Sequence, residues 1–422
     1  MMTLNAMMKR IKIVLLLSLV VGKGYAQNVI SLTQALKTAT EQNPYMKVGA
    51  LGVDVSKADI VSAKLRPNPI LNNQSLQALT PSQLTNNPKL LTGESMQTWW
   101  QLTKEFQLGG QRKNRIDYAN QNVKLAEKEY AEFQRGLYTD VAFKWVEAWN
   151  TRKQIDLLKT AVNNIDTLVT INSYRFKKQI ITETELYRTQ LIAKQYKIQI
   201  SELNQELRQQ LNELQLMIGA KENVSISISA DLGVDSFLKV DSLLADAYAS
   251  RTDLQYYQTR KGAMESNIKL QQSLAFPRTE AGFIYNPQNT LPYFGIYATV
   301  ELPFFDRNQG EIKKAKVQRE QALTQIEAVQ NTIRTEVQNA SLQRETNQNN
   351  LKSYALITEQ ADQILKNVRY SYSVGGTTII DFLEAQRSWL ETQQQYTNLL
   401  HKYHQSQIQL LSVTGLINKL AQ

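Results

Sequence analysis

The residue types that most often perform chemistry are scarce in this chain of 422 residues. It contains no cysteine, which excludes a thiol nucleophile, a thiolate metal site and disulfides. Its two histidines, His401 and His404, lie three positions apart, and such a pair alone is a weak indication of a metal site. The sequence has no glycine-rich phosphate loop, nucleophile elbow or zinc motif. We therefore expect no enzyme, no cofactor and no resident metal.

The distribution of charged residues and methionines excludes further classes of function. The formal net charge is +10, and part of it comes from the basic residues of the first 26 positions, Lys9, Arg10, Lys12 and Lys23. The other basic residues are interspersed with acids, whereas a nucleic-acid-binding protein would gather them on one patch, so we expect no nucleic-acid partner. The methionines beyond residue 8 are dispersed, which argues against a thioether relay for copper; they are Met46, Met96, Met217 and Met264.

The N-terminus has the pattern of an export signal. A basic segment that ends at Lys12 precedes apolar residues 13–21, which are too few to span a bilayer. Gly24-Tyr25-Ala26 then gives the small-x-small pattern of a cleavage site. We predict a signal peptide over 1–26, and the lack of cysteine excludes acylation of the mature N-terminus as a lipoprotein. No later stretch approaches 18 apolar residues, so we expect no transmembrane helix.

The rest of the sequence favours very long helices. Residues 111–172 contain no proline, and apolar residues recur there at spacings of three and four. The apolar stripes are narrow and nearly heptad, which is typical of coiled-coil packing. A helix over 111–172 would span roughly 90 Å. We predict a second long helix over 308–371 and two of about half that length over 183–218 and 242–275.

The chain is also predicted to be internally duplicated. The segment that starts at Phe176 is repeated from Tyr372, with the same offset of 196 positions at several landmarks. Each repeat is expected to contain a helix, a strand pair, a long helix, a tip turn and a returning helix. The predicted first repeat is 27–240, with strand pair 68–108, tip turn 174–183 and equatorial segment 219–240, which includes a short strand near Val224. The second repeat is 241–415, with strand pair 279–305 and tip turn 371–381, and a tail covers 416–422.

Short segments of alternating polarity lie between the helices. The clearest are 96–108 and 293–305, and 69–79 and 279–286 are weaker. Each is close to the 9–11 residues that a tilted strand needs to cross a bilayer, although a half-buried hairpin in a soluble domain has the same pattern. Four strands cannot close a barrel, so membrane strands would have to be shared between chains. Three chains would give twelve strands around a lumen, and four chains remain an alternative.

A family resemblance becomes specific at the second tip turn. Residues 372–386, which begin Tyr372-Ser373-Val374-Gly375-Gly376, resemble the helix-turn-helix at the periplasmic tip of TolC-like outer-membrane efflux proteins. Residues 106–110 and 302–311 resemble the strand-to-helix corners of the family's cobalt–zinc–cadmium and copper–silver efflux branch. The resemblance covers about residues 30–415.

This resemblance implies a mainly α fold with a small β-barrel part. Long coiled-coil-like helices would form a periplasmic α-barrel, and four transmembrane strands per chain would complete a 12-stranded barrel in a homotrimer. It also implies a location in the cell outer membrane, in contact with its lipid. The expected partners are a periplasmic adaptor, or membrane fusion, protein and an inner-membrane pump of the RND type.

The same resemblance supplies the candidate site residues. It places Asp381 and Glu384 in a ring of acids at the tip constriction, and their spacing puts both on one helix face. Six such carboxylates in a trimer would attract cations and bind them. Gly375 and Gly376 suit a tight tip turn that requires φ above zero.

A polar network between helices keeps the tip closed in this family. Tyr372, Thr184 and Glu185 match three of its members. The fourth member, an arginine, falls on Thr377 in this sequence, so the strength of the predicted latch is open.

The expected function is passive, gated export of small solutes through the outer-membrane duct of a tripartite efflux system, with heavy-metal cations as the expected cargo. One alternative is a duct of the same fold for drugs, other small molecules or type I secretion. The other is a soluble periplasmic coiled-coil adaptor or scaffold.

Overall fold

The computed structural model describes residues 28–80, 89, 92, 95–226, 242–287 and 292–421. The predicted signal peptide and residues 227–240 of the predicted equatorial segment lie outside the described residues. About three quarters of the chain is helical, and it divides into two compact units. Neither unit coincides with a predicted repeat, because each takes segments from both halves of the chain.

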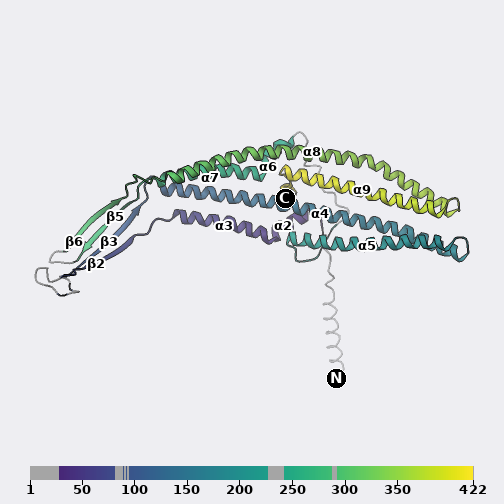
Figure 1. The fold of residues 1–422 in the computed structure, drawn as a ribbon, viewed down its shortest axis with the longest axis horizontal. Helices are drawn as coiled ribbons and strands as arrows, with labels where there is room; N and C mark the ends of the chain where they lie inside the picture. The colour runs from purple at the N-terminus through teal and green to yellow at the C-terminus, as the bar shows by residue number, and fades with distance from the viewer. Residues whose placement is uncertain are drawn as a thin grey trace, which may run out of the picture. The chain divides into compact units, whose positions relative to one another are not determined.

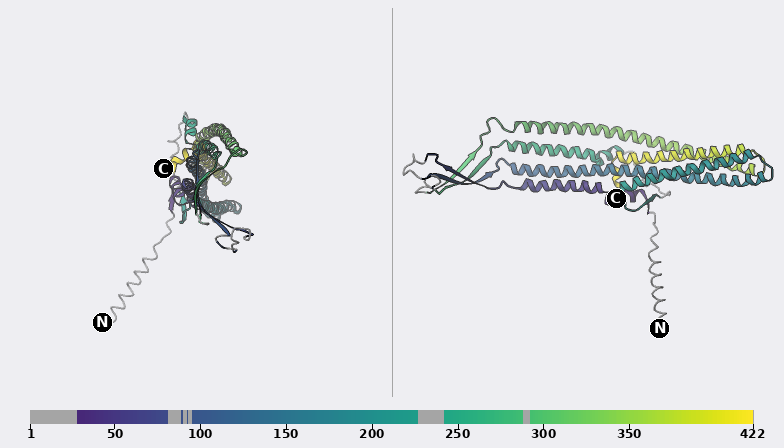
Figure 2. Two further views of the ribbon diagram at one scale, coloured as in Figure 1. Left: turned by 90° about the vertical axis from the view of Figure 1, so that its left-hand side faces the viewer. Right: turned by 60° about the horizontal axis from the view of Figure 1, so that its bottom comes forward.

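The first unit, here called the helical unit, holds the described residues up to Met46, within 134–250 and from Ile333 onward. In this unit α4 forms a hairpin with α5, and α8 forms a second hairpin with α9 (Figures 1 and 2). The helices that contribute to it are α2 (Leu32–Gln42), α4 (Gln111–Lys177), α5 (Glu183–Ile218), α6 (Leu243–Ser250), α8 (Gln309–Ser373), α9 (Ile379–Val413) and the 3₁₀ helix η4 (Leu416–Ala421).

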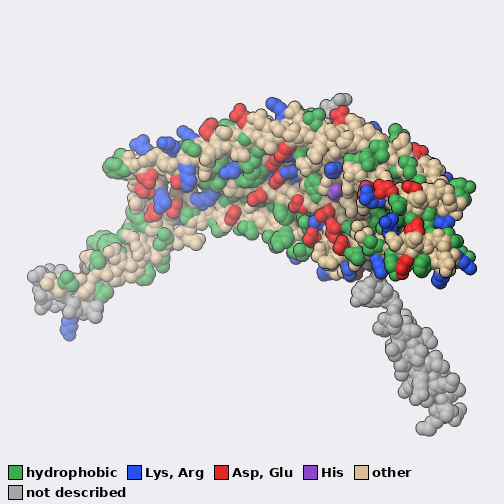
Figure 3. Space-filling view, turned by 45° about the vertical axis from the view of Figure 1, so that its right-hand side comes forward, with side chains coloured by type: hydrophobic (Ala, Val, Ile, Leu, Met, Phe, Trp, Pro, Cys, Tyr) green, Lys and Arg blue, Asp and Glu red, His purple; other side chains and the backbone are tan. Residues whose placement is uncertain are grey.

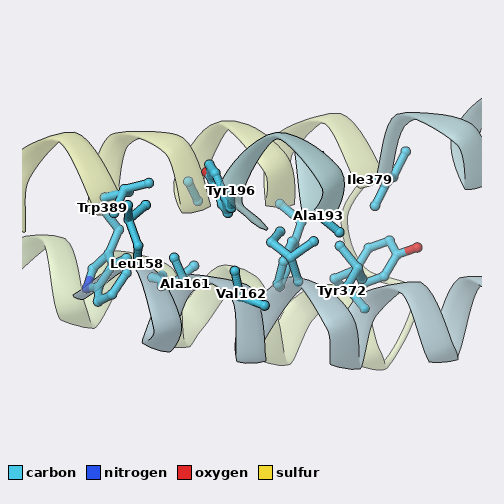
Figure 4. Packing of buried hydrophobic residues seen from close by; sticks show 14 residues of the cluster. Leu158, Ala161, Val162, Ala193, Tyr196, Tyr372, Ile379 and Trp389 are labelled. Carbon is cyan, nitrogen blue, oxygen red and sulfur yellow. The ribbon is translucent and has the colours of Figure 1, made fainter. Parts of the chain in front are cut away.

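A buried apolar cluster joins the two hairpins of the helical unit. Leu158 and Ile165 of α4 pack with Tyr196 of α5, and with Phe382 and Trp389 of α9 (Figure 4). These positions continue the spacing of three and four that predicted the helices. Burial of such side chains contributes about 1.5–3 kcal/mol each, so the apolar stripe rather than helix propensity stabilises these long hairpins.

The helical unit also contains a short parallel pair of strands. β1 (Asn28–Ile30) pairs with β4 (Val224–Ile226), and Nε1 of the buried Trp145 donates to the Ile30 carbonyl at 3.2 Å. The strand predicted near Val224 is therefore present. Its partner β1 was not predicted, since three residues carry too little pattern to indicate a strand.

The second unit, here called the sheet unit, comprises residues 47–133 and 251–332, as far as the structure describes them. It contains most of α3 (Pro44–Lys64), α7 (Thr252–Leu274), the first turns of α4 and α8, and one four-stranded sheet. The sheet is antiparallel throughout, in the order β2 (Ile70–Gln77), β3 (Met96–Phe106), β5 (Thr279–Asn286) and β6 (Tyr293–Val300). The four predicted strands are present, and the last ends at Val300 rather than at residue 305.

The two faces of this sheet differ in chemistry. The pairings Leu102↔Phe283 and Phe283↔Ile296 put these three side chains on one face, together with Trp100 and Phe294. The Phe283 and Phe294 rings stack at 5.7 Å between centroids, yet both side chains are exposed. The opposite face carries mainly polar residues of β3, namely Gln97, Gln101, Thr103 and Glu105, together with Trp99. One chain thus leaves a sheet face of large apolar side chains uncovered.

One predicted helix is interrupted. The prediction of a single helix over 242–275 was wrong, because α6 ends at Ser250 and α7 begins at Thr252. Arg251 between them has an extended backbone, with φ −66° and ψ 116°, and its guanidinium binds the Asp253 carboxylate at 2.6 Å. The first repeat has a matching break, where Asn43 separates α2 from α3 and its Oδ1 accepts from the Tyr45 amide at 2.7 Å.

Within the described ranges, no helix combines the length and the apolar character that a membrane span requires.

Candidate functional site

The two hairpins of the helical unit end in turns of the same geometry. After α4, Gln179 adopts φ +59° and the Ile180 amide donates to the Arg175 carbonyl at 2.9 Å. After α8, Gly375 adopts φ +82° and the Gly376 amide donates to the Ser371 carbonyl at 2.8 Å. Both are Schellman-type helix ends. Only Gly375 of the predicted glycine pair requires the left-handed conformation.

The returning helices also begin in the same way. Thr182 caps α5 by accepting from the Glu185 amide, and the Glu185 carboxylate accepts from the Thr182 amide at 2.8 Å. Thr378 and Asp381 form the equivalent capping box at the start of α9. Such boxes satisfy amides that a helix end would otherwise leave without partners. Each tip is therefore a left-handed turn followed at once by a capped helix.

Asp381, one of the two predicted constriction acids, is held by its own turn. Its Oδ2 accepts from the hydroxyls of Thr377 and Thr378, both at 2.7 Å, and from the Thr378 amide at 3.2 Å. The Thr378 hydroxyl, and then the Thr377 hydroxyl, hold the pKa of this exposed carboxyl below its ordinary value. The side chain is therefore ionised at neutral pH and fixed in direction.

Glu384, the other predicted acid, lies one turn further along α9 and is exposed. Its carboxylate is 3.6 Å from the Arg387 guanidinium, which also contacts Glu391 at 3.5 Å. Exposed pairs of this kind contribute little stability. Both acids are available to solvent within one chain, so a ring of acids would have to be built from several copies.

The predicted latch residues do not meet within the chain. Thr184 is exposed, Glu185 binds Thr182 in its capping box, and Thr377 binds Asp381. Tyr372 is buried, with 5% of its surface exposed, and its hydroxyl donates to Oδ1 of Asn172 at 2.6 Å. The capping box occupies the Glu185 carboxylate within one chain, so the latch that the resemblance implies stays a prediction.

Tyr372 brings together three polar residues that the sequence pattern did not predict as site residues. Asn172 and Thr189 are completely buried and are joined by a hydrogen bond of 3.2 Å from the Asn172 amide nitrogen to the Thr189 hydroxyl. The Arg175 guanidinium lies 4.7 Å from the centre of the Tyr372 ring, and its Nη2 donates to the carbonyls of Tyr372 and Ser373. We call Asn172, Arg175, Thr189 and Tyr372 the tip clamp.

The tip clamp ties three helices together, since its members come from α4, α5 and α8. Figure 4 shows Tyr372 beside the apolar cluster, close to Ala193 and Ile379. A buried polar layer is stable only if its groups are paired, and separating the hairpins would break the bond between the Tyr372 hydroxyl and Oδ1 of Asn172, while Asn172 would keep its bond to Thr189. The signal in the sequence is an asparagine at position 172, three residues after Val169 on the apolar stripe of α4.

The two histidines have structural surroundings. His404 contacts the Trp149 ring edge-on at 5.0 Å and pairs through Nδ1 with Gln407 at 3.0 Å. Burial lowers the pKa of His401 below its ordinary value, so it is neutral at pH 7. Among the residues that the structure describes, no group of three or more His, Cys, Asp or Glu side chains is arranged to hold a metal ion.

Comparisons with known proteins place this architecture in a family. The chain belongs to the outer membrane efflux protein family, whose profile matches residues 35–220 and 243–416. Family membership makes it an outer-membrane efflux protein of the TolC-like fold. This supports the predicted family, fold class and location.

Individual relatives are distant in sequence, and their names refer to different efflux substrates. The chain is 20% identical to the probable outer membrane lipoprotein SilC of Salmonella typhimurium, over 91% of this chain and 85% of SilC. It is 21% identical to the toluene efflux pump outer membrane protein TtgF of Pseudomonas putida, over 91% and 83% of the two chains. The cation efflux system protein CusC of Escherichia coli is also a relative, at 20% identity over 74% of this chain and 73% of CusC. A crystal structure of CusC has a TM-score of 0.73 and 17% sequence identity, over 93% of this chain and 94% of that chain.

Proposed function

We propose that this chain forms the passive outer-membrane duct of a tripartite efflux system and makes or breaks no covalent bond. The observation that carries the proposal is the sheet of the sheet unit. One of its faces is apolar and exposed, and the outer edges of β2 and β6 pair with no other strand among the described residues. An apolar sheet with two open edges suits a barrel wall that other copies complete.

Three copies are the smallest number that would leave a lumen. Two copies would give eight strands, whose interior is filled by side chains, whereas three would give twelve. We propose the trimer for this reason. In it, β6 of one chain would pair with β2 of the next, and the apolar faces would together contact lipid.

The tip of the helical unit is proposed as the gate. Asp381 and Glu384 from each chain would line the mouth, and their negative charge would favour cations. The tip clamp would hold the two hairpins of each chain together while the mouth is narrow. Opening would then separate α8 from α4 and break the hydrogen bond between Tyr372 and Asn172.

The proposed partners are a periplasmic adaptor and an inner-membrane pump, which we expect to be of the RND type. Membership of an efflux family and the names of the relatives, which describe parts of efflux pumps or systems, support this proposal. A duct has no energy source of its own, so a pump must supply the driving force.

Metal cations are proposed as the cargo, on the strength of the acidic tip and the relation to CusC. Similar identity to TtgF keeps toluene-like solvents as the second candidate. The test is growth of a strain that lacks this chain, with and without a plasmid copy, on copper, silver, cobalt, zinc, cadmium and toluene. Sensitivity to at least one metal that the plasmid relieves supports the proposal, and sensitivity to toluene alone contradicts it.

A further inference from the structure

The junction between the strands and the helices of the sheet unit carries a concentration of positive charge that the duct proposal does not use. At this end lie six basic residues that we call the junction patch: Arg66, Lys104, Lys113, Arg278, Lys313 and Lys316. The connections at the other end of the sheet, residues 78–95 and 287–292, contain only Lys89 and Glu94 as charged residues. On the face seen in Figure 3, the sheet is nearly free of charged side chains, and these begin where its helices begin.

Hydrogen bonds hold the segments of the junction side by side. The Arg112 guanidinium donates to the Lys64 carbonyl at 2.8 Å, which joins the start of α4 to the end of α3. Asn114 donates to the Lys269 carbonyl at 3.3 Å, and Asn308 donates to the Gln271 carbonyl at 2.9 Å. These bonds join α4 and α8 to α7, so basic residues from distant parts of the sequence lie at one level.

No ion pair in the described residues neutralises the junction patch, although Glu280, Glu301 and Glu311 lie in the same segments. Five of the six side chains are exposed, all except Lys104. Within the described parts of the chain, none of the six is within 4.0 Å of a carboxylate. An unpaired cluster of this kind on a membrane protein is free to bind anions in its surroundings.

Lys104 shows where the junction patch would lie in a bilayer. It stands on the apolar face of the sheet, between Leu102 and Phe106 and opposite Ala281. Its ammonium group reaches toward the helices and donates to the Pro67 carbonyl. A lysine on a lipid-facing surface extends in this way when its charged end lies at headgroup depth.

Large apolar side chains accompany the charges. Phe276, Phe304 and Phe305 are 52%, 70% and 95% exposed, and Leu302 is 64% exposed. Aromatic and basic side chains together are typical of the boundary between acyl chains and headgroups.

We infer that the junction patch binds the phosphate groups of anionic phospholipids in the leaflet next to the helices. This inference rests on the proposed membrane position of the sheet. The phosphodiester supplies the negative charge that the patch lacks, and the acyl chains cover the exposed rings beside it. The patch would fix the depth of the sheet in the bilayer.

The test uses purified full-length protein in phosphatidylcholine vesicles with a trace of spin-labelled phosphatidylglycerol or spin-labelled phosphatidylcholine. The junction variant is Arg278→Gln with Lys313→Gln and Lys316→Gln. The matched control is Lys194→Gln with Lys352→Gln and Lys366→Gln, which removes three exposed, unpaired lysines of the helical unit. Circular dichroism confirms that each variant is folded.

One basic side chain near an anionic surface changes association about fivefold. We therefore expect wild type and control to prefer labelled phosphatidylglycerol at least about fivefold, and the junction variant to lose most of this preference. In wild type, salt at about 1 M should also remove it, since the Debye length is then about 3 Å. Equal preference in wild type and the junction variant overturns the inference. If no labelled lipid of either kind is motionally restricted, the membrane position of the sheet is itself wrong, and with it the proposed duct.

Discussion

The hydroxyl of Tyr372 donates to Asn172 where both side chains are buried, and Asn172 in turn donates to Thr189. Polar residues at apolar-stripe positions cost stability unless they are paired, so their presence suggests a contact that must be specific and breakable. The family resemblance located Tyr372 and Asp381, but it did not identify Asn172 or Thr377 as the residues that they bind in this structure. Spacing identifies which face a residue occupies, whereas partners on other helices depend on packing.

Tyr372→Phe tests the clamp because it removes one hydroxyl and leaves the Asn172 oxygen buried without that donor. We expect the free energy of unfolding to fall by about 1–3 kcal/mol and the resting channel to open more often. Tyr370→Phe is the matched control, since Tyr370 is 69% exposed. Thermal unfolding and single-channel recording check both variants, and equal behaviour of the two would contradict the clamp.

Asp381 gives a prediction for pH. Its folded pKa is lowered by the hydroxyls of Thr378 and Thr377, so its stabilisation is fully present above the ordinary pKa of about 3.9 and is lost as pH falls through the lowered value. The stability difference between wild type and Asp381→Asn should be constant from pH 7 to about pH 4.5 and should close at lower pH. Thermal midpoints measure it, with Glu384→Gln as control. A difference that stays constant down to pH 2 would refute the assignment.

The helices show how far local sequence determines structure. The predicted start and end of α5, residues 183 and 218, agree with the structure, because Thr182 and Glu185 form a local capping box and Gly219 ends the helix at φ +69°. The break at Arg251 was missed since no neighbouring proline or glycine marks it in the sequence. Only β4 of the β1–β4 pair was predicted. The two strands are almost 200 positions apart, and β1 has no visible pattern in the sequence.

The second tip turn offers a matched test of backbone conformation. Gly375→Ala places a side chain at φ +82° and should destabilise the second hairpin by about 1 kcal/mol. Gly376→Ala is the control, since its backbone lies outside the left-handed region and an added Cβ would meet the Ser371 carbonyl oxygen at an ordinary 3.5 Å. The thermal midpoint should fall for Gly375→Ala only. An equal fall for both would show that space, not conformation, limits this turn.

At the scale of the whole molecule, one chain leaves part of its sheet uncovered. Strands β2 and β6 leave open edges within the described sheet, and the apolar sheet face is uncovered. The family fold was predictable because strand length, helix length and duplication are all sequence properties. The number of chains was not, since strand count restricts it without fixing it.

The mass of the detergent-solubilised protein tests the number of chains. We expect a species of three chains that converts to single chains on heating, each lighter than the 48.2 kDa of the full sequence because the predicted signal peptide is removed. Twelve shared strands account for this stability, because separation exposes backbone groups of six strand edges. A monomer in every mild detergent would contradict the shared barrel.

The most direct measurement of the central claim is conductance of the purified protein in planar bilayers, recorded for wild type, for Tyr372→Phe, and for Tyr372→Phe combined with Asp381→Ala and Glu384→Ala. We predict discrete cation-selective steps that are more frequent in Tyr372→Phe than in wild type. Loss of the two carboxylates should then reduce cation selectivity and block by divalent cations. No steps from either wild type or the Tyr372→Phe variant, with protein shown to be inserted, would contradict the duct.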